Sequence, residues 1–209
     1  GNVYGGGELG LVGALAELTE KDVIDNLKFT FTDGSTSVII SGSTTIAGNV
    51  YGGGKGEDGT ITHSEAPLTT IILGSVAKST EVKISERVSI GTAISGNLVD
   101  GTGNVYGGGE LGIVGTYSDS NTDNTRIYVG GNSTIVISGG TILNEVYGGG
   151  EGTPKNVLSG AVGNATTIVS GSTTTIKGNV YGGGAYSIVG GTNVTIDRTP
   201  KDGKIDPKI

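Results

Sequence analysis

The chain repeats, with small changes, the stretch Gly48-Asn49-Val50-Tyr51-Gly52-Gly53-Gly54. Its Val-Tyr-Gly-Gly-Gly core occurs five times, and successive tyrosines are 47, 55, 41 and 34 residues apart. Gly-Asn precedes the core in four copies, whereas the fourth copy has Asn144-Glu145. A constant unit with a variable interval indicates a repeat protein. The tyrosines of the five copies are Tyr4, Tyr51, Tyr106, Tyr147 and Tyr181.

A second block recurs upstream of this motif and consists of two short apolar strands joined by a Ser-Gly turn. It is clear at residues 38–46, 135–142 and 167–176, and we identify a looser copy at 88–96. The β-branched residues of these blocks favour ordered β structure over a solvated linker. Each unit therefore contains a strand, a Ser-Gly turn, a second strand, a glycine, a short third strand and Gly-Gly-Gly.

Three short strands separated by glycine corners predict a coil that returns on itself and stacks on the next coil. We expect an all-β parallel β-solenoid with a narrow core of Val and Ile, since the chain has only two Phe and no Trp or Met. Glycine suits the corners because it accepts positive φ and lets backbones approach closely. The expected corner residues are Gly52, Gly53, Gly54, Gly107, Gly108, Gly109, Gly148, Gly149, Gly150, Gly182, Gly183 and Gly184.

The variable intervals predict insertions that leave the stack at its corners. A sequence like a capping box at Thr19 and an apolar face at helical spacing predict a short helix at about 14–27. The polar stretch at about 55–68 predicts a surface loop. We expect the solenoid to cover residues 1–197, with the charged residues 198–209 as a C-terminal tail or linker.

Composition and charge disfavour several classes of partner. The net charge is −7, and the 13 Lys and Arg residues are scattered, so the chain lacks the basic stripe that nucleic-acid binding requires. We expect no membrane insertion, because no stretch of about 18 apolar residues is present. The absence of cysteine excludes disulfides and cysteine-ligated metal.

The Gly-Asn-Val-Tyr-Gly-Gly-Gly motif, following strands rich in Ser, Gly and Thr, resembles the repeat regions of large bacterial surface proteins. These are the β-helices of adhesins and autotransporter passengers. The resemblance is to the style of repeat and extends over nearly the whole chain. It implies a right-handed parallel β-helix, export from the cell, and binding rather than catalysis. The variable insertions and the expected helix depart from a regular passenger.

Three weaker motifs are better explained as structural elements. Gly-Gly-Gly-Glu-Leu-Gly, at 5–10 and 107–112, lacks the Gly-Lys-Ser/Thr of a P-loop and the βαβ context of a dinucleotide site. His63, the only histidine, lies among acidic residues but on a stretch typical of a solvated loop. The stretch 197–206 resembles a calcium loop but has Pro200 where a ligand would be required. We therefore expect no cofactor and no metal.

These observations predict an extracellular or cell-surface protein with a structural or adhesive role, binding glycans or a host or neighbouring surface through a repeat-built face. We expect no enzymatic activity, because the strand blocks carry almost no charge. A β-helix polysaccharide lyase or hydrolase is the alternative, because parallel β-helices include such enzymes; a glycosidase of this kind would need two carboxylates close together. Binding to ice or a crystal surface is a further alternative, because Thr44-Thr45 and 173–175 could form threonine ladders.

The direction of the tyrosines bears on ligand binding. Alternation along a strand places Asn and Tyr of the motif on one face and Val on the other. Because Glu145 replaces the asparagine in one copy, we expect Val to face the core and Tyr to face away. An exposed ladder would offer a platform for sugars or proteins; alternatively, each ring packs over its neighbour. The candidate ligand-binding residues are Tyr51, Tyr106, Tyr147 and Tyr181.

The two ends of the repeat array predict self-association. The first motif, at Tyr4, has only three residues before it, so its coil is incomplete. Residues 1–13 are rich in glycine and apolar residues, and Val194 and Ile196 form a plausible final strand. Solenoids normally close such ends with a polar cap, and exposed strand edges pair with other strands. We expect end-to-end association, as a segment of a longer array or as a filament subunit.

Overall fold

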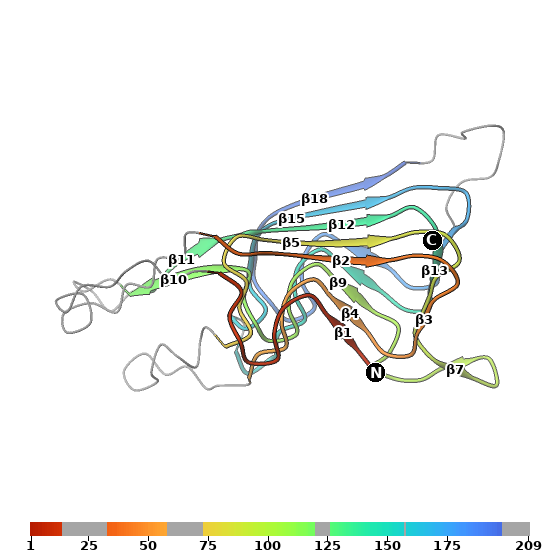
Figure 1. Ribbon diagram of the computed structural model, residues 1–209, viewed down its shortest axis with the longest axis horizontal. Helices are drawn as coiled ribbons and strands as arrows, with labels where there is room; N and C mark the ends of the chain where they lie inside the picture. Colours follow the sequence, from red (N-terminus) through yellow and green to blue (C-terminus); the bar gives the residue numbers. More distant parts are fainter. Residues whose placement is uncertain (14–32, 58–72, 120–125, 157, 198–209) are drawn as a thin grey trace.

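The computed structural model describes residues 1–13, 33–57, 73–119, 126–156 and 158–197. Their strands form three parallel sheets in which each turn of the chain adds one strand (Figure 1). No helix occurs in these ranges. This is the all-β, solenoid-like architecture predicted from the repeat. The expected helix at 14–27, and most of the expected loop at 55–68, lie outside the described residues.

The first sheet consists entirely of Val-Tyr pairs from the repeated motif. Neighbouring strands are parallel and in register, so that valine pairs with valine and tyrosine with tyrosine. In sheet order the strands are β1 (Val3–Tyr4), β4 (Val50–Tyr51), β9 (Val105–Tyr106), β14 (Val146–Tyr147) and β17 (Val180–Tyr181).

The other two parallel sheets contain the remaining strands of each coil. The longer one has the order β18 (Val189–Ile196), β15 (Val162–Val169), β12 (Asn132–Ile137), β5 (Ser79–Ile84) and β2 (Ser35–Ile40). The shorter one has the order β16 (Thr174–Ile176), β13 (Gly140–Ile142), β6 (Ser89–Ile90) and β3 (Thr45–Ile46). Single parallel bridges between coils add a fourth contact line, through Val12, Val76, Val114 and Val162.

Two antiparallel hairpins interrupt the coils and project from them (Figure 1). One joins β7 (Ala93–Ile94) to β8 (Asn97–Leu98), and the other joins β10 (Gly115–Asp119) to β11 (Arg126–Gly130). The β7–β8 hairpin shows that the looser strand block predicted at 88–96 is wrong, because Ala93–Ile94 pairs antiparallel with Asn97–Leu98 and not with a neighbouring coil. The coil strand equivalent to Val38–Ile40 is Val82–Ile84, which pairs with it directly.

The core is a narrow aliphatic column, as the composition predicts. Its fourteen buried members are all Val or Ile, contributed by all three sheets. Each coil alone leaves its apolar face uncovered, so burial comes from stacking neighbours. The buried members are Val38, Ile40, Val50, Val82, Ile84, Val88, Ile90, Val105, Ile135, Ile137, Ile142, Val146, Val169 and Ile176.

The motif glycines are required by close approach between coils. A Cβ on Gly107 would lie 2.2 Å from the carbonyl oxygen of Gly148, and one on Gly108 would lie 2.7 Å from the amide nitrogen of Gly150. None of the glycines in the five Gly-Gly-Gly corners has a φ in the left-handed region. Of the two reasons expected for glycine at these corners, backbone proximity is therefore the one that operates.

Hydroxyl groups donate hydrogen bonds to the carbonyl oxygen of the first glycine in the Gly-Gly-Gly corner. Thr36 donates to the oxygen of Gly52, and Thr80 donates to that of Gly107, each at 2.5 Å. Ser133 does the same for Gly148 at 2.5 Å. A buried carbonyl without a partner is costly, so these hydroxyls allow the glycine segment to pass close to the longer sheet.

Candidate functional site

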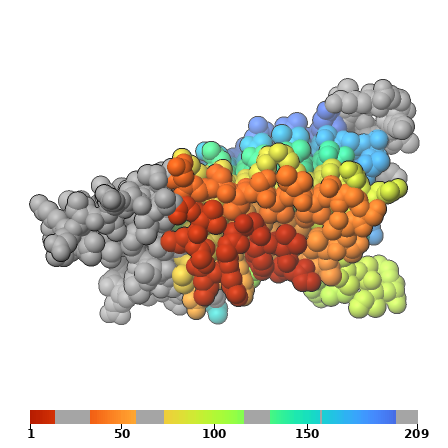
Figure 2. Space-filling model, in the orientation of Figure 1, coloured from red at the N-terminus to blue at the C-terminus, as the bar shows by residue number. Residues whose placement is uncertain are grey.

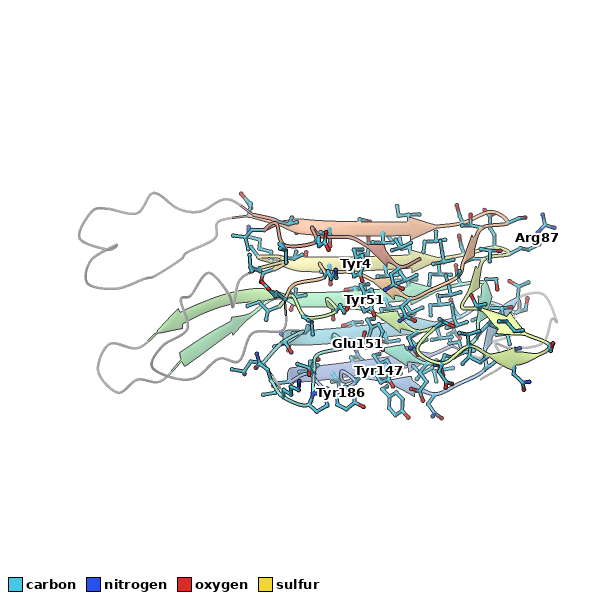
Figure 3. The ribbon with its side chains drawn as sticks, turned by 90° about the horizontal axis from the view of Figure 1, so that it is seen from below. Tyr4, Tyr51, Arg87, Tyr147, Glu151 and Tyr186 are labelled. Atoms are coloured by element: carbon cyan, nitrogen blue, oxygen red, sulfur yellow. The ribbon has the colours of Figure 1, made fainter. Side chains whose placement is uncertain are left out.

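The motif tyrosines form one continuous column across all five coils. Successive ring centroids are 4.9, 4.9, 5.0 and 5.0 Å apart, and successive ring planes differ by 3–14°. The spacing follows from the parallel register of the first sheet, because neighbouring strands lie about 4.8 Å apart. Figure 3 shows Tyr4, Tyr51 and Tyr147 following one another across the coils.

Exposure differs strongly along the column. Tyr51 and Tyr106 are 1% and 3% exposed, whereas Tyr181, at the end, is 42% exposed. Tyr4 and Tyr147 are intermediate. The expectation that valine faces the core is confirmed, and asparagine and tyrosine do share the opposite face. The exposed platform is wrong for Tyr51 and Tyr106, because both side chains are buried.

The motif asparagines hold the register between coils. The side-chain oxygen of Asn2 accepts from the amide of Asn49 at 2.9 Å, and that of Asn49 accepts from the amide of Asn104 at 2.9 Å. The amide of Glu145 donates to Asn104 in the same way at 3.2 Å. In Asn2, Asn49 and Asn179 the side-chain amide also donates to the tyrosine hydroxyl of its own motif.

Carboxylates accept hydrogen bonds from three hydroxyls of the column. Tyr51 donates to Glu151 at 2.5 Å, Tyr4 donates to Glu110, and Tyr147 donates to Glu145. Glu145 occupies the asparagine position of its motif. It also accepts from Asn179 at 3.2 Å, which explains how a glutamate is tolerated there.

Glu110 and Glu151 belong to a row that follows the Gly-Gly-Gly corners. Backbone hydrogen bonds between adjacent coils align this row. In each bond the amide of the row residue donates to the carbonyl oxygen of the last corner glycine in the preceding coil. The pairs are Lys55 with Gly7, Glu110 with Gly54, Glu151 with Gly109, and Ala185 with Gly150. Lys55 forms an ion pair with Glu8 at 2.6 Å. This row of charged residues was not predicted from the sequence. The available signal was Gly-Gly-Gly-Glu, which occurs in three of the five motifs, beginning at Gly5, Gly107 and Gly148.

Burial and these carboxylates shift several pKa values. Burial, followed by the hydrogen bond to Glu110, raises the pKa of Tyr4 to about 12. Burial also raises the pKa of Tyr51, Tyr106 and Tyr147, and carboxylates add to each shift. The pKa of Glu151 is raised by burial and by repulsion from Glu110, although the hydrogen bond from Tyr51 opposes the shift. Tyr4, Tyr51, Tyr106 and Tyr147 are thus neutral phenols at physiological pH.

The column opens to solvent at the first coil. A pocket of about 500 Å³ lies there, lined by Asn2, Tyr4, Gly6, Glu8, Lys55 and Glu110. Figure 2 shows residues 1–13 forming an accessible surface of the molecule. The pocket combines an aromatic ring with amide, ammonium and carboxylate groups, which can orient a polar ligand.

The structure describes some of the other candidate motifs from the sequence, and the rest lie outside the described residues. The Gly-Gly-Gly-Glu-Leu-Gly stretches at 5–10 and 107–112 form corners of the coil. His63 and residues 198–206 lie outside the described ranges. Among the residues that the structure describes, no three His, Asp or Glu side chains gather closely enough to hold a metal ion. The same residues include no helix long and apolar enough to span a bilayer.

Comparison with known proteins does not assign the chain to a family. No protein-family model, curated protein or solved structure gives a significant match. The features of the chain that bear on its function are the stacked coils, the tyrosine column and the two end coils.

Proposed function

We propose that the chain is an extracellular structural and adhesive repeat protein whose coils join end to end. The observation that carries the proposal is that one coil–coil interface is repeated throughout the molecule, while the two end coils leave its two opposite sides unpaired. We also propose that the coil is right-handed, as connections between parallel strands nearly always are.

The end strands offer edges that match each other. Strands β1 and β2 lie at one end of their sheets, and β17 and β18 lie at the opposite end. Each sheet is parallel throughout, so β17 could pair with β1 of a second copy in the register already seen between β14 and β17. Such a contact joins two different surfaces, and a head-to-tail contact that does not close produces an open filament.

The last described coil leaves core positions open to water. Val194 and Ile196 are in register with Thr167 and Val169, which are buried. Val194 and Ile196 are nevertheless 40% and 39% exposed. A further coil stacked on β18 would cover both side chains, and burial of apolar surface favours such stacking.

Gly183 provides a selective test of this association. A Cβ on Gly183 meets nothing within 4 Å, whereas a Cβ on Gly108 or Gly149, at the same motif position, would meet the following coil. Gly183→Ala should therefore leave the isolated chain folded but obstruct a second copy. Size-exclusion chromatography with light scattering over a range of concentrations should show association of the native chain and loss of it in the variant.

Two further measurements make the test decisive. Ile94→Lys, on the projecting β7–β8 hairpin, changes an exposed apolar residue away from the end strands and should associate like the native chain. Electron microscopy of the associated sample should show unbranched rods. A native chain that stays monomeric at every concentration would overturn the end-to-end proposal, as would equal association of Gly183→Ala.

The adhesive part of the proposal concerns the free end of an array, at the first coil that no second copy covers, where Tyr4 stays accessible. The pocket beside Tyr4 has the mixture of ring face and polar groups that could bind a sugar. A glycan array should show binding that Tyr4→Ala removes and that Ile94→Lys retains. An array with no binding would remove the glycan from the proposal and leave self-association unaffected.

A further inference from the structure

The tyrosine column has the geometry of an electron-transfer path. Four successive contacts of 4.9–5.0 Å join nearly parallel rings from Tyr4 to Tyr181. Electron transfer between aromatic groups weakens steeply with distance, so rings in contact favour it. The second and third rings, Tyr51 and Tyr106, are shielded from water, which keeps soluble quenchers away from them.

Carboxylates are placed where oxidation of the phenols would require proton acceptors. A phenol that loses an electron becomes a strong acid and must release its proton. Tyr4, Tyr51 and Tyr147 already donate their hydroxyl protons to Glu110, Glu151 and Glu145. Each proton can therefore move along an existing hydrogen bond and return along the same bond.

The composition directs oxidation to tyrosine. The chain has no Trp, Met or Cys and a single His, so its tyrosines are the most readily oxidised side chains. Five of the eight tyrosines belong to the column. An oxidising equivalent that reaches the first coil therefore meets few oxidisable side chains other than the tyrosines of the column.

We propose that the tyrosine column conducts oxidising equivalents between the first coil and Tyr181. A one-electron oxidant of the metal-complex class, such as a ruthenium(III) polypyridyl, removes an electron from Tyr4, and the phenolic proton moves to Glu110. The resulting phenoxyl radical takes an electron from Tyr51, whose proton moves to Glu151, while Glu110 returns its proton to Tyr4. An electron from Tyr147 then reaches Tyr51 across the ring of Tyr106, as the proton of Tyr147 moves to Glu145 and Glu151 returns its proton to Tyr51.

The radical reaches solvent at the far end of the column. Tyr181 gives an electron to Tyr147 and releases its own proton to water, because its ring is 42% exposed. Glu145 at the same time returns its proton to Tyr147. A hydrogen-atom donor in solution, such as a thiol or ascorbate, finally supplies one electron and one proton to Tyr181. The net reaction transfers one electron from that donor to the oxidant and leaves the protein unchanged.

The absence of cysteine allows a site-specific test. Leu9→Cys, at an exposed position of the first coil, can carry a ruthenium polypyridyl photo-oxidant. Flash oxidation with a sacrificial electron acceptor and a nitroso spin trap, followed by peptide mapping, shows which tyrosine is trapped as a radical. The expected product is an adduct on Tyr181, at the opposite end from the oxidant.

The decisive variant is Tyr147→Phe, which keeps a ring in the column but removes an oxidisable phenol. The adduct on Tyr181 should fall several-fold, and adducts on Tyr4 should rise. Tyr186→Phe is the matched control, because Tyr186 is an exposed tyrosine outside the ring stack, and it should leave the Tyr181 adduct unchanged. Circular dichroism verifies that both variants fold.

Two outcomes would overturn conduction along the column. One is an undiminished Tyr181 adduct in Tyr147→Phe, because the oxidant would then reach Tyr181 through solvent. The other appears on mixing labelled Tyr181→Phe with unlabelled native chain: an adduct on the unlabelled chain would show transfer between molecules. Both experiments are carried out below the concentration of any self-association, so their results do not depend on the end-to-end proposal.

Discussion

At the scale of single residues, the motif is a set of positions with separate tasks. Valine fills the core, asparagine fixes the spacing between coils, and tyrosine stacks on the opposite face. Glycine is required where two backbones come closer than a Cβ permits. The carbonyl oxygen of the first glycine in the Gly-Gly-Gly corner accepts a hydrogen bond from a serine or threonine outside the motif. That residue lies on the longer sheet.

The middle glycine of the motif supports a direct prediction. Gly108→Ala would place a Cβ 2.7 Å from the amide nitrogen of Gly150, which is backbone and cannot move aside easily. We expect the free energy of unfolding to fall by about 1–3 kcal/mol, as for other overpacked sites. Chemical denaturation of dilute protein measures the change.

The same motif position supplies the control. Gly183→Ala places its Cβ in open space, so its effect on dilute protein should stay within about 0.5 kcal/mol. Equal losses in Gly108→Ala and Gly183→Ala would contradict the steric explanation, because they would indicate a general preference for glycine at this position.

At the scale of elements, the first sheet and its tyrosine column behave as one unit, and its protonation couples to folding. Four column phenols have raised pKa values in the folded chain. In the unfolded chain a tyrosine ionises near pH 10. The folded state therefore holds more protons than the unfolded state above that pH, and the free energy of unfolding should decrease as pH rises.

This linkage predicts alkaline unfolding coupled to tyrosine ionisation. The stabilisation by the protonated column is complete below about pH 10 and is lost progressively as pH rises toward and beyond the pKa of Tyr4, about 12. Phenolate absorbance and circular dichroism, followed together, should show late-ionising tyrosines that titrate as β structure disappears. Ionisation of every tyrosine near pH 10 with the β signal intact would be the contrary result.

Much of this element could be predicted from the sequence, and the limits have physical causes. Alternation correctly placed Val50 in the core and Tyr51 on the opposite face, because strand geometry is local. The burial of Tyr51 depends on neighbouring coils, which a single motif does not encode. The block at Val82–Ile84 was missed because its outward-facing positions carry Glu81 and Lys83, whose charges conceal the repeat.

At the scale of the whole molecule, the stack is continuous and the additions project from it. The β7–β8 hairpin leaves the coil and returns, with the amide of Val99 bonded to the oxygen of Thr92 at 2.8 Å. Replacing Ala93–Leu98 by a Gly-Gly link should lower the free energy of unfolding by no more than about 1 kcal/mol, because loop-length changes alter stability little. Denaturation of the shortened chain, compared with Gly108→Ala, tests this separation.

The in-register stacking has a further consequence for dimensions. Each coil adds one strand to a sheet and one ring to the column, at a rise of 4.9–5.0 Å between rings, while the cross-section stays the same. Gain or loss of a repeat unit therefore changes the length of the solenoid in fixed steps and leaves its width untouched. The number of Val-Tyr-Gly-Gly-Gly copies therefore determines how far the stacked coils extend.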